Sequence, residues 1–532
     1  MTAPVPPLAY LPEILTLVAA LGIFLLDTLG VRRRAAFGAW TTVFLAAAFV
    51  SVLADLGVPG LGGLATLPSS YLTAGAVGPV VFTALGLVFQ AIFLSAGILV
   101  AFASLSDPDD EVGIPMFYGL LGLATLGTLL VALSADLVFL LLSVEVTGIS
   151  TYVLVGYTRR DPRALEASMK FYIIGALSTA TSFFGASLLY GAYHTTSLAT
   201  IAQGLPPDAS LALVGFGILA VGLGFKVTAV PFHMWAVDVY DGAPSTVSAF
   251  LAAGSKKMGI FAYFVVFVAV TRLFAGPQGW PLYIALGGLA VTTMTVGNIL
   301  ALQQKTLKRM LAYSSISQAG YMLLGIAVDT PSTLSGATLL VAAHVLMKGG
   351  AFLVVAALAQ IGLGARIDDL RGLGYSHPIL AGSFSVLLLS LAGIPGTFGF
   401  MGKFYIFAGA IEAGGLFILL AVVGLLNSAL SVFYYARILK IVYMSDEAPA
   451  PSQESGAALH RSLTHSSQGV ASPPPRGIPG LGRIAAEIRA AGAARWIAIV
   501  AAAVLTVALG IYPTPLVHAF NAAATQFWSL GY

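Results

Sequence analysis

Ionisable side chains lie inside long apolar runs of this 532-residue chain. Lys226 stands in one such run, five positions before Pro231 and seven before His233. Burying an ammonium group in hydrocarbon is costly, so such a residue usually faces a bundle interior or a water-filled cavity. Proline removes a backbone N–H and breaks the helix, which frees carbonyls that can bind water or ions. The stretch 223–257 therefore predicts a broken membrane helix on an ion path.

Further ionisable residues occupy similar positions: Glu145, Lys256, Lys257, His344, Lys348 and Lys403. Glu145 is a lone carboxylate inside its run, and its expected role is to pair with a lysine. Lys256 and Lys257 are adjacent and point to different helix faces, so only one of them readily faces a pathway. His344 and Lys348 are four apart and share a helix face, which suits either a proton relay or a polar contact between spans.

A row of such groups, bridged by water, can pass protons across the middle of a bilayer. Burial favours the neutral form of a lysine, whereas a nearby carboxylate favours the charged form, so a buried lysine can switch between the two. Lys403 follows an interruption at 393–396, whereas Lys226 precedes its own. His233 either takes part in proton transfer or only caps the broken helix. The competing interpretation for the whole row is purely structural pairing.

Other charged residues have simpler interpretations. Glu166 and Lys170 are four apart and predict an interfacial ion pair. Asp238 and Asp241 follow the first interruption and are expected to stay solvated.

Composition places the chain in a membrane. It is 58% hydrophobic and 9% charged, with a mean hydropathy of +0.93, whereas soluble domains carry about 25% charged residues. A net charge of +3, spread among loops, does not indicate a nucleic-acid partner. The lack of cysteine excludes disulfides, cysteine-ligated iron–sulfur clusters and thiolate catalysis within the chain. The histidines lack metal-site spacing, and no phosphate loop or dinucleotide fingerprint appears.

A membrane span needs about 20 mostly apolar residues, and the chain contains about fourteen such segments. The fold class is therefore an all-α polytopic membrane protein with about 14 transmembrane helices. Two spans are long and broken in the middle, near Pro231 and at 393–396, and a third is interrupted at 348–350. The spans are 8–29, 35–56, 78–104, 115–133, 136–157, 167–190, 210–240, 244–271, 281–302, 308–327, 332–360, 379–412, 415–444 and 493–512.

Basic residues give the orientation. They gather in the loops after the first, fifth, ninth, eleventh and thirteenth spans, as in 32–34, 159–163 and 305–309, with Arg272 as the main exception. Positively charged loops face the cytoplasm, so both chain ends are predicted to be periplasmic. The segment 445–492, rich in Ser, Pro, Ala and Gly, predicts a cytoplasmic linker, with a short interfacial helix between 482 and 496.

The two broken spans lie five spans apart, which indicates an internal repeat of the kind found in transporters. The expected regions are 1–114 with helices 1–3, 115–271 with helices 4–8, 281–444 with helices 9–13, the linker 445–492, and 493–532 with helix 14 and a tail.

Three parts of the chain resemble signatures of the antiporter-like membrane subunits of respiratory complex I. The segments 225–235 (FKVTAVPFHMW) and 238–244 (DVYDGAP) resemble the seventh-to-eighth-helix signature. The segment 307–316 (LKRMLAYSSI) resembles the ninth-to-tenth signature, and 391–404 (LAGIPGTFGFMGKF) resembles the twelfth. The likeness covers spans 4 to 13 and implies two inverted five-helix repeats, each with a broken helix.

The resemblance implies roles for individual residues. Glu145 matches the glutamate that pairs with Lys226. Lys256, which follows a serine, matches the connecting lysine of the eighth helix, and Lys403 matches the lysine of the twelfth. His344 and Lys348 fall where the family carries relay groups of the eleventh helix.

Among these subunits the N type is the most similar. About twenty residues follow span 14, too few at about 1.5 Å each for the long lateral helix of the L type. Lys403 stands where the M type has glutamate, and 169–172 (MKFY) and 255–256 (SK) are also similar to the N type. The linker 445–492 is longer than is usual for that type.

The resemblance implies a proton-translocating membrane subunit of a bacterial NADH:quinone oxidoreductase, located in the cell (inner) membrane. This chain would move protons without a cofactor of its own, while NADH, FMN, iron–sulfur clusters and quinone would bind to partner subunits. Its partners would be the other membrane and peripheral subunits and the lipid bilayer. The alternatives are a subunit of a multi-subunit sodium/proton antiporter or membrane-bound hydrogenase, a non-transporting membrane scaffold, and a stand-alone solute transporter.

Overall fold

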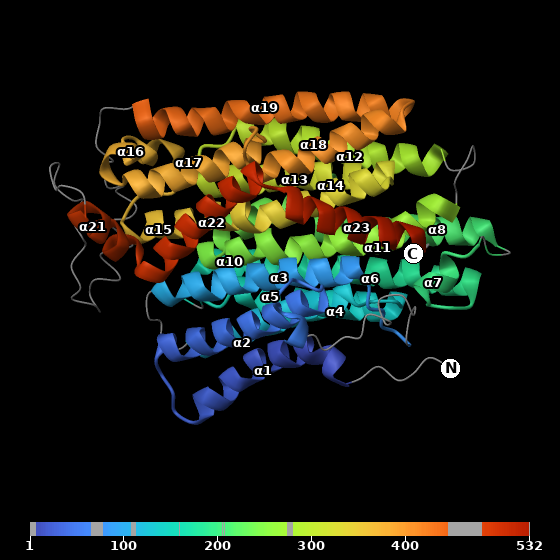
Figure 1. Ribbon diagram of the computed structural model, residues 1–532, viewed down its shortest axis with the longest axis horizontal. Helices are drawn as coiled ribbons and strands as arrows, with labels where there is room; N and C mark the ends of the chain where they lie inside the picture. Colours follow the sequence, from blue (N-terminus) through green and yellow to red (C-terminus); the bar gives the residue numbers. More distant parts are fainter. Residues whose placement is uncertain are drawn as a thin grey trace.

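The computed structural model describes residues 7–64, 78–107, 113–158, 160–204, 206, 208–273, 280–444 and 481–530. In these residues the long helices run side by side along one common direction (Figure 1). The described part contains no β-strand longer than an isolated bridge, and the three bridges are Val80–Ser134, Asp136–Ser197 and Thr306–Arg366. The fold is therefore an all-helical bundle, as predicted.

The first half of the bundle ends with the eighth span. Its helices are α1 Leu11–Thr28, α2 Arg34–Asp55, α3 Ala84–Ala103, α4 Ile114–Ala132, α5 Leu137–Val155, α6 Pro162–Tyr193, α7 Leu198–Ile201, α8 Ala209–Val227, α9 Met234–Gly242, α10 Ser245–Phe250, the π-helical turn η5 Leu251–Ser255 and α11 Lys256–Leu273.

The second half begins with the ninth span. Its helices are α12 Trp280–Leu302, α13 Leu307–Val328, α14 Pro331–His344, the π-helical turn η7 Val345–Gly349, α15 Gly350–Gln360, α16 Leu373–Ser376, α17 Pro378–Ala392, α18 Phe398–Ala413, α19 Leu416–Met444, α21 Leu481–Ala491, α22 Ala493–Ile511 and α23 Thr514–Leu530.

The predicted spans correspond closely to the observed helices. Thirteen helices of the described residues are long and apolar enough to cross a membrane. The remaining predicted span, 379–412, is present as α17 and α18, which have 15 and 16 residues and are separated by the predicted break. The other broken span is α8 followed by α9, five spans earlier. The two broken spans thus occupy equivalent places in two five-helix repeats.

Three local predictions need correction. The span 332–360 is not interrupted at 348–350, because the helix continues through η7, where bonds from residue i to i+5 widen it. The interfacial helix ends at Ala491, since Gly492 has φ +78° and α22 begins directly after it. The predicted tail after span 14 is largely helical, as α23 packs on α14 and α3. Residues 445–480 of the predicted linker lie outside the described residues.

Close contact between α6 and α8 places the first broken span. Ser178 donates its hydroxyl to the carbonyl of Gly222 at 2.7 Å. A Cβ atom on Gly222 would lie 2.2 Å from the Ser182 hydroxyl, so only glycine permits this approach. Small residues commonly allow membrane helices to pack in this way. The contact holds the last turn of α8, which carries Lys226, against α6.

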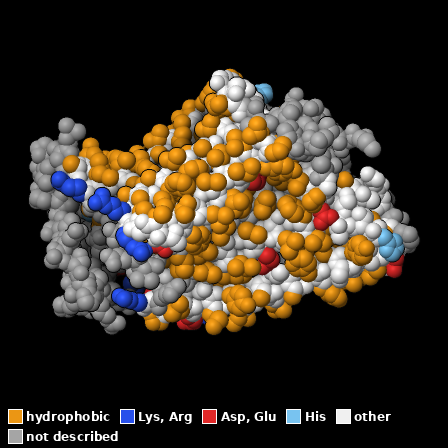
Figure 2. Space-filling view, turned by 90° about the horizontal axis from the view of Figure 1, so that it is seen from below, with side chains coloured by type: hydrophobic (Ala, Val, Ile, Leu, Met, Phe, Trp, Pro, Cys, Tyr) orange, Lys and Arg blue, Asp and Glu red, His pale blue; other side chains and the backbone are white. Residues whose placement is uncertain are grey.

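The charges separate the two ends of the bundle. Helix α7 lies at one end, whereas α21 lies at the other (Figure 1). On the face in Figure 2, hydrophobic side chains cover the broad middle, and the Lys and Arg side chains gather at the end that carries α21. An apolar middle with basic side chains at one end is a distribution typical of membrane proteins.

A buried charged cluster fixes the start of α22. Arg495, about 1% exposed, pairs with Asp107 at the end of the third span and also bonds to Gln360. Arg34 lies 4.0 Å from the same carboxylate. Burial raises the pKa of Asp107, although the two arginines act in the opposite direction. The cluster joins α22 to the second, third and eleventh spans.

Candidate functional site

Glu145 and Lys226 form an ion pair inside the first repeat. Asp136 caps α5 by accepting the backbone N–H groups of Val138 and Phe139, and Glu145 follows on the same helix. Lys226 Nζ lies 2.9 Å from Glu145 Oε1, and the two side chains are 8% and 17% exposed. The sequence-based expectation that these two residues meet is thus met in the structure.

Two hydroxyl groups complete the surroundings of this pair. Lys226 Nζ donates to the Tyr152 hydroxyl oxygen at 2.9 Å. Thr179, on α6, donates to Glu145 Oε1 at 2.6 Å. Sequence reasoning missed both residues, because neither is ionised and only helix packing brings them to the pair.

The first break is closed by side chains from other helices. Helix α8 ends at Val227, and Thr228, whose φ is +64°, turns the chain away from the helix. The Trp235 indole N–H donates at 3.2 Å to the carbonyl of Phe225, which also accepts the backbone N–H of Thr228. The Val230 N–H donates to the Thr293 hydroxyl at 3.0 Å, which links the break to the second repeat. The carbonyl next to Lys226 is thus used for structure and does not bind the lysine.

His233 occupies the N-cap position of α9, but its side chain makes no capping hydrogen bond. Its Nδ1 atom is buried without a hydrogen-bond partner in the described part of the chain. The interpretation of His233 as a side-chain cap is therefore wrong, and its role in proton transfer stays a prediction.

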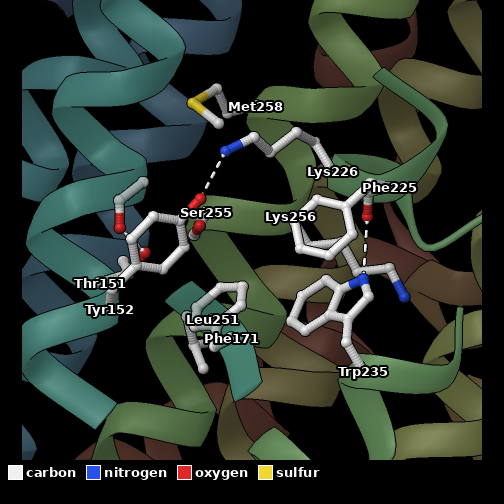
Figure 3. Close-up of a pocket in the computed structure, with 11 residues that line it drawn as sticks. Thr151, Tyr152, Phe171, Phe225, Lys226, Trp235, Leu251, Ser255, Lys256 and Met258 are labelled. Atoms are coloured by element: carbon white, nitrogen blue, oxygen red, sulfur yellow. Dashed lines mark hydrogen bonds between the residues drawn. The ribbon is translucent and has the colours of Figure 1, made fainter. Parts of the chain in front are cut away.

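A small cavity lies between Lys226 and Lys256. Its volume is about 10 Å³, and its lining includes both lysines, Tyr152, Trp235 and Ser255. This volume is roughly what one water molecule needs. Figure 3 shows Lys226 pointing to Tyr152, with Trp235 bonded to Phe225 on the other side. Both lysines therefore line one cavity that has room for about one water molecule.

Lys256 connects the two repeats. It begins α11 directly after the π-helical turn η5, and its Nζ donates to the Ser315 carbonyl at 2.9 Å and the Ser315 hydroxyl at 3.3 Å. Ser315 belongs to α13. Lys257 points elsewhere, with its Nζ 3.7 Å from the Met322 sulfur. Both lysines are buried, and only Lys256 bonds to an oxygen of the second repeat.

His344 and Lys348 do not pair with each other. Lys348 lies within the π-helical turn η7, which begins directly after His344. His344 Nδ1 lies 2.9 Å from the Leu340 carbonyl, and its Nε2 is buried without a partner among the described residues. Lys348 Nζ donates to the Leu311 carbonyl at 3.2 Å and to the Ser314 hydroxyl. Both residues are fully buried, but their side chains form hydrogen bonds with different residues.

Lys403 binds the carbonyls that the second break sets free. Helix α17 ends at Gly393, whose φ of +87° favours glycine. Lys403 Nζ donates to the carbonyls of Leu391 and Ala392 at 3.0 Å each and to the Ser428 hydroxyl at 3.1 Å. The Tyr321 ring lies 4.8 Å from the ammonium group. In the described residues no carboxylate forms an ion pair with Lys256, Lys257, Lys348 or Lys403.

A larger cavity of about 590 Å³ lies where α6, α9 and α13 meet. The predicted pair of Glu166 and Lys170 is confirmed there at 2.8 Å. Asp238 is not simply solvated, because it lies 3.3 Å from Lys170 and 3.2 Å from Arg309. Lys308 donates to the Ala243 carbonyl at 2.8 Å. The residues expected to face solvent thus form a charged, water-accessible recess.

The geometry resembles that of known proteins. A family model described as NADH:quinone oxidoreductase/Mrp antiporter, transmembrane, matches residues 134–430. NADH-quinone oxidoreductase subunit N of Trichlorobacter lovleyi is 37% identical over 445 residues, which are 82% of this chain and 86% of that protein. The chain belongs to this family. F(420)H(2) dehydrogenase subunit N of Methanosarcina mazei is 43% identical over 371 residues, 68% of this chain and 74% of that one.

The solved structures include a chain of respiratory complex I from Thermus thermophilus with bound aureothin. It is 29% identical to this family member, with a TM-score of 0.72, and the match covers 95% of this chain and 98% of that one. The likeness to antiporter-like membrane subunits is therefore confirmed for sequence and fold together. No group of three or more His, Asp or Glu side chains that could hold a metal ion occurs among the described residues.

Proposed function

We propose that this chain is the N-type proton-translocating membrane subunit of a NADH:quinone oxidoreductase, and that its buried row carries the protons. The observation behind the proposal is the series of buried groups that begins at the ion pair of α5 and α8, crosses α11 and η7, and ends at Lys403 in α18. Membership of the NADH:quinone oxidoreductase/Mrp antiporter family supports the same reaction. Electron transfer then takes place in partner subunits, which hold NADH, FMN, iron–sulfur clusters and quinone.

The ion pair is the element of the row that can switch. When Glu145 and Lys226 are paired, the carboxylate favours the charged lysine. When the carboxylate takes up a proton or loses contact, the lysine can release its proton through the cavity toward Lys256. From there the proton passes Lys348 to Lys403, and His344, His233 and Lys257 lie beside this route.

Related complexes offer an alternative, because the same family model includes subunits of Mrp antiporters. A sodium/proton antiporter or membrane-bound hydrogenase would use the same row with different partner subunits. Purification of the complex from its own membrane decides between these possibilities. Flavin and iron–sulfur subunits together with NADH-dependent quinone reduction support the proposal, whereas a complex without redox subunits contradicts it.

A scaffold without transport is the alternative from another class. It predicts that Glu145, Lys226 and Lys403 can be neutralised together without loss of coupling. The buried, unpaired lysines argue against it, because a structural role would be served as well by apolar side chains of similar size.

The proposed orientation places both chain ends in the periplasm and the linker 445–492 in the cytoplasm of a bacterial cell membrane. The chain has no cysteine, so single cysteines report their own side of the membrane without interference. A cysteine at position 460 should react with an impermeant reagent only from the cytoplasmic side. Reaction from the periplasmic side would invert the orientation.

A further inference from the structure

Three lysines of the row share one feature: each bonds to one serine hydroxyl and has no carboxylate partner among the described residues. The pairs are Lys256 with Ser315, Lys348 with Ser314, and Lys403 with Ser428. All other oxygens that these three ammonium groups contact are backbone carbonyls. Lys226 differs, because its partners are a carboxylate and a phenol.

The same triangle of bonds recurs at Lys348 and Lys403. Lys348 Nζ and the Ser314 hydroxyl both donate to the Leu311 carbonyl, at 3.2 and 3.3 Å. Lys403 Nζ and the Ser428 hydroxyl both donate to the Ala392 carbonyl, at 3.0 and 3.2 Å. In each triangle the lysine also donates to the serine oxygen. The serine proton thus rests on a carbonyl while the lysine is an ammonium ion.

A hydroxyl group is the one partner in each triangle that serves both forms of the lysine. Carbonyl oxygens only accept hydrogen bonds, so they satisfy an ammonium group and leave the lone pair of a neutral amine without a donor. A serine hydroxyl accepts from the ammonium group and, after rotation, donates to the neutral amine. A buried polar atom without a partner costs about 1–3 kcal/mol.

We propose that Ser314 and Ser428, with Ser315 in a lesser role, are further residues of the proton path, and that each hydroxyl turns between a backbone carbonyl and its lysine as the lysine changes charge. During transfer the hydroxyl oxygen accepts a proton from the ammonium ion and releases its own proton to a water molecule of the path, so the serine ends unchanged. At Ser314 the Tyr435 hydroxyl is a neighbour, because it bonds to the same oxygen at 2.9 Å. This inference rests on the proposed function.

Ser315 has the lesser role because its hydroxyl lies farther from its lysine, at 3.3 Å, than the hydroxyls of Ser314 and Ser428 lie from theirs. Matched controls exist for the other two serines. Ser317 is buried on α13 and donates to the Ser314 carbonyl, whereas Ser431 is buried on α19 and donates to the Ser428 carbonyl. Both control hydroxyls bond to a backbone carbonyl, and neither contacts a lysine.

The test measures protons moved per electron pair by the intact complex in proteoliposomes. Ser314→Ala and Ser428→Ala should each lower proton transfer by roughly tenfold. Ser317→Ala and Ser431→Ala should leave it unchanged. Ser428→Thr should transfer protons normally, because threonine keeps the hydroxyl. Its additional methyl group can be accommodated, since Ser428 is only partly buried. A structural role would not distinguish threonine from alanine in this way.

Glu145→Gln, measured in parallel, distinguishes a failure of the serine path from a failure of the proposed function. If it blocks transfer while Ser314→Ala and Ser428→Ala behave like their controls, the serine path is overturned and the proposed function stands. If Ser428→Thr is as defective as Ser428→Ala, the hydroxyl is not the group that matters and the inference is overturned. If Glu145→Gln transfers protons normally, the proposed function itself is contradicted.

Discussion

The two broken helices hold their lysines by different means. Lys226 precedes its break and is balanced by the full charge of Glu145, while the neighbouring Phe225 carbonyl accepts from Thr228 and Trp235. Lys403 follows its break and binds two freed carbonyls, a hydroxyl and an aromatic face. The first repeat thus balances a cation with an anion, and the second balances it with dipoles.

This difference gives the two halves different tasks. An ion pair is a coupled unit, because removing one partner leaves a buried charge uncompensated. A lysine held by carbonyl dipoles has no such partner among the described residues, so its charge can change without leaving a buried carboxylate unpaired. The first repeat is therefore suited to receive the signal that starts proton release, and the second is suited to pass the proton on.

The largest effect is expected for Glu145→Gln, which removes the only carboxylate of the row. Proton transfer per electron pair should fall about tenfold or more, because the cost of breaking a buried pair is about 3–5 kcal/mol and part of it appears in the transfer barrier. Assembly should be retained, since the change keeps the shape of the side chain. The control is Glu166→Gln, which changes an exposed ion pair of the same repeat and should leave proton transfer unchanged. Equal defects in both variants would contradict a special role for the buried pair.

Replacing Lys226 should reduce the stability of the protein more than replacing Lys403. Lys226→Ala leaves Glu145 without its partner, whereas Lys403→Ala leaves only neutral groups behind. The first change should destabilise the protein by about 2 kcal/mol more than the second, a value reduced because Glu145 is partly exposed. The thermal midpoints of the two purified complexes provide the measurement. A larger loss for Lys403→Ala would show that the freed carbonyls matter more than the ion pair.

The smallest effect concerns the residues that end α8 and α17. Thr228 and Gly393 both have positive φ, at +64° and +87°, a region that favours glycine over threonine. Thr228→Gly should therefore stabilise the protein by about 1 kcal/mol, and Gly393→Ala should destabilise it by about the same amount. A Cβ atom at Gly393 would also lie 3.0 Å from the Lys403 side chain. Opposite signs in the thermal shift support this account, whereas stabilisation by Gly393→Ala would refute it.

The sequence predicts the spans, the breaks and the ion pair, because each depends on strong local signals. Apolar runs of about 20 residues define the spans, and proline and glycine mark where Val227 and Ala392 end their helices. The pairing of Glu145 with Lys226 follows from the cost of leaving either charge alone in hydrocarbon.

The partners of the other lysines depend on how the helices are rotated and packed, which no local pattern gives. Ser314 and Ser428 look like many other small polar residues in membrane helices, and only the folded bundle brings them to Lys348 and Lys403. The turns η5 and η7 also lack a sequence signal, and the separate partners of His344 and Lys348 could not be read from their spacing of four. The third break expected at 348–350 failed for the same reason, since a π-helical turn keeps the helix continuous.

The central claim is that Lys226 and Lys403 belong to one continuous path. Proton flux through the complex in proteoliposomes tests it most directly when Lys226→Ala, Lys403→Ala and the double variant are measured side by side. A series path predicts that the double variant is little worse than the more severe single variant, because one gap already blocks the flow. Losses that add in free energy would mean that the two repeats conduct protons independently, and the single path would be contradicted.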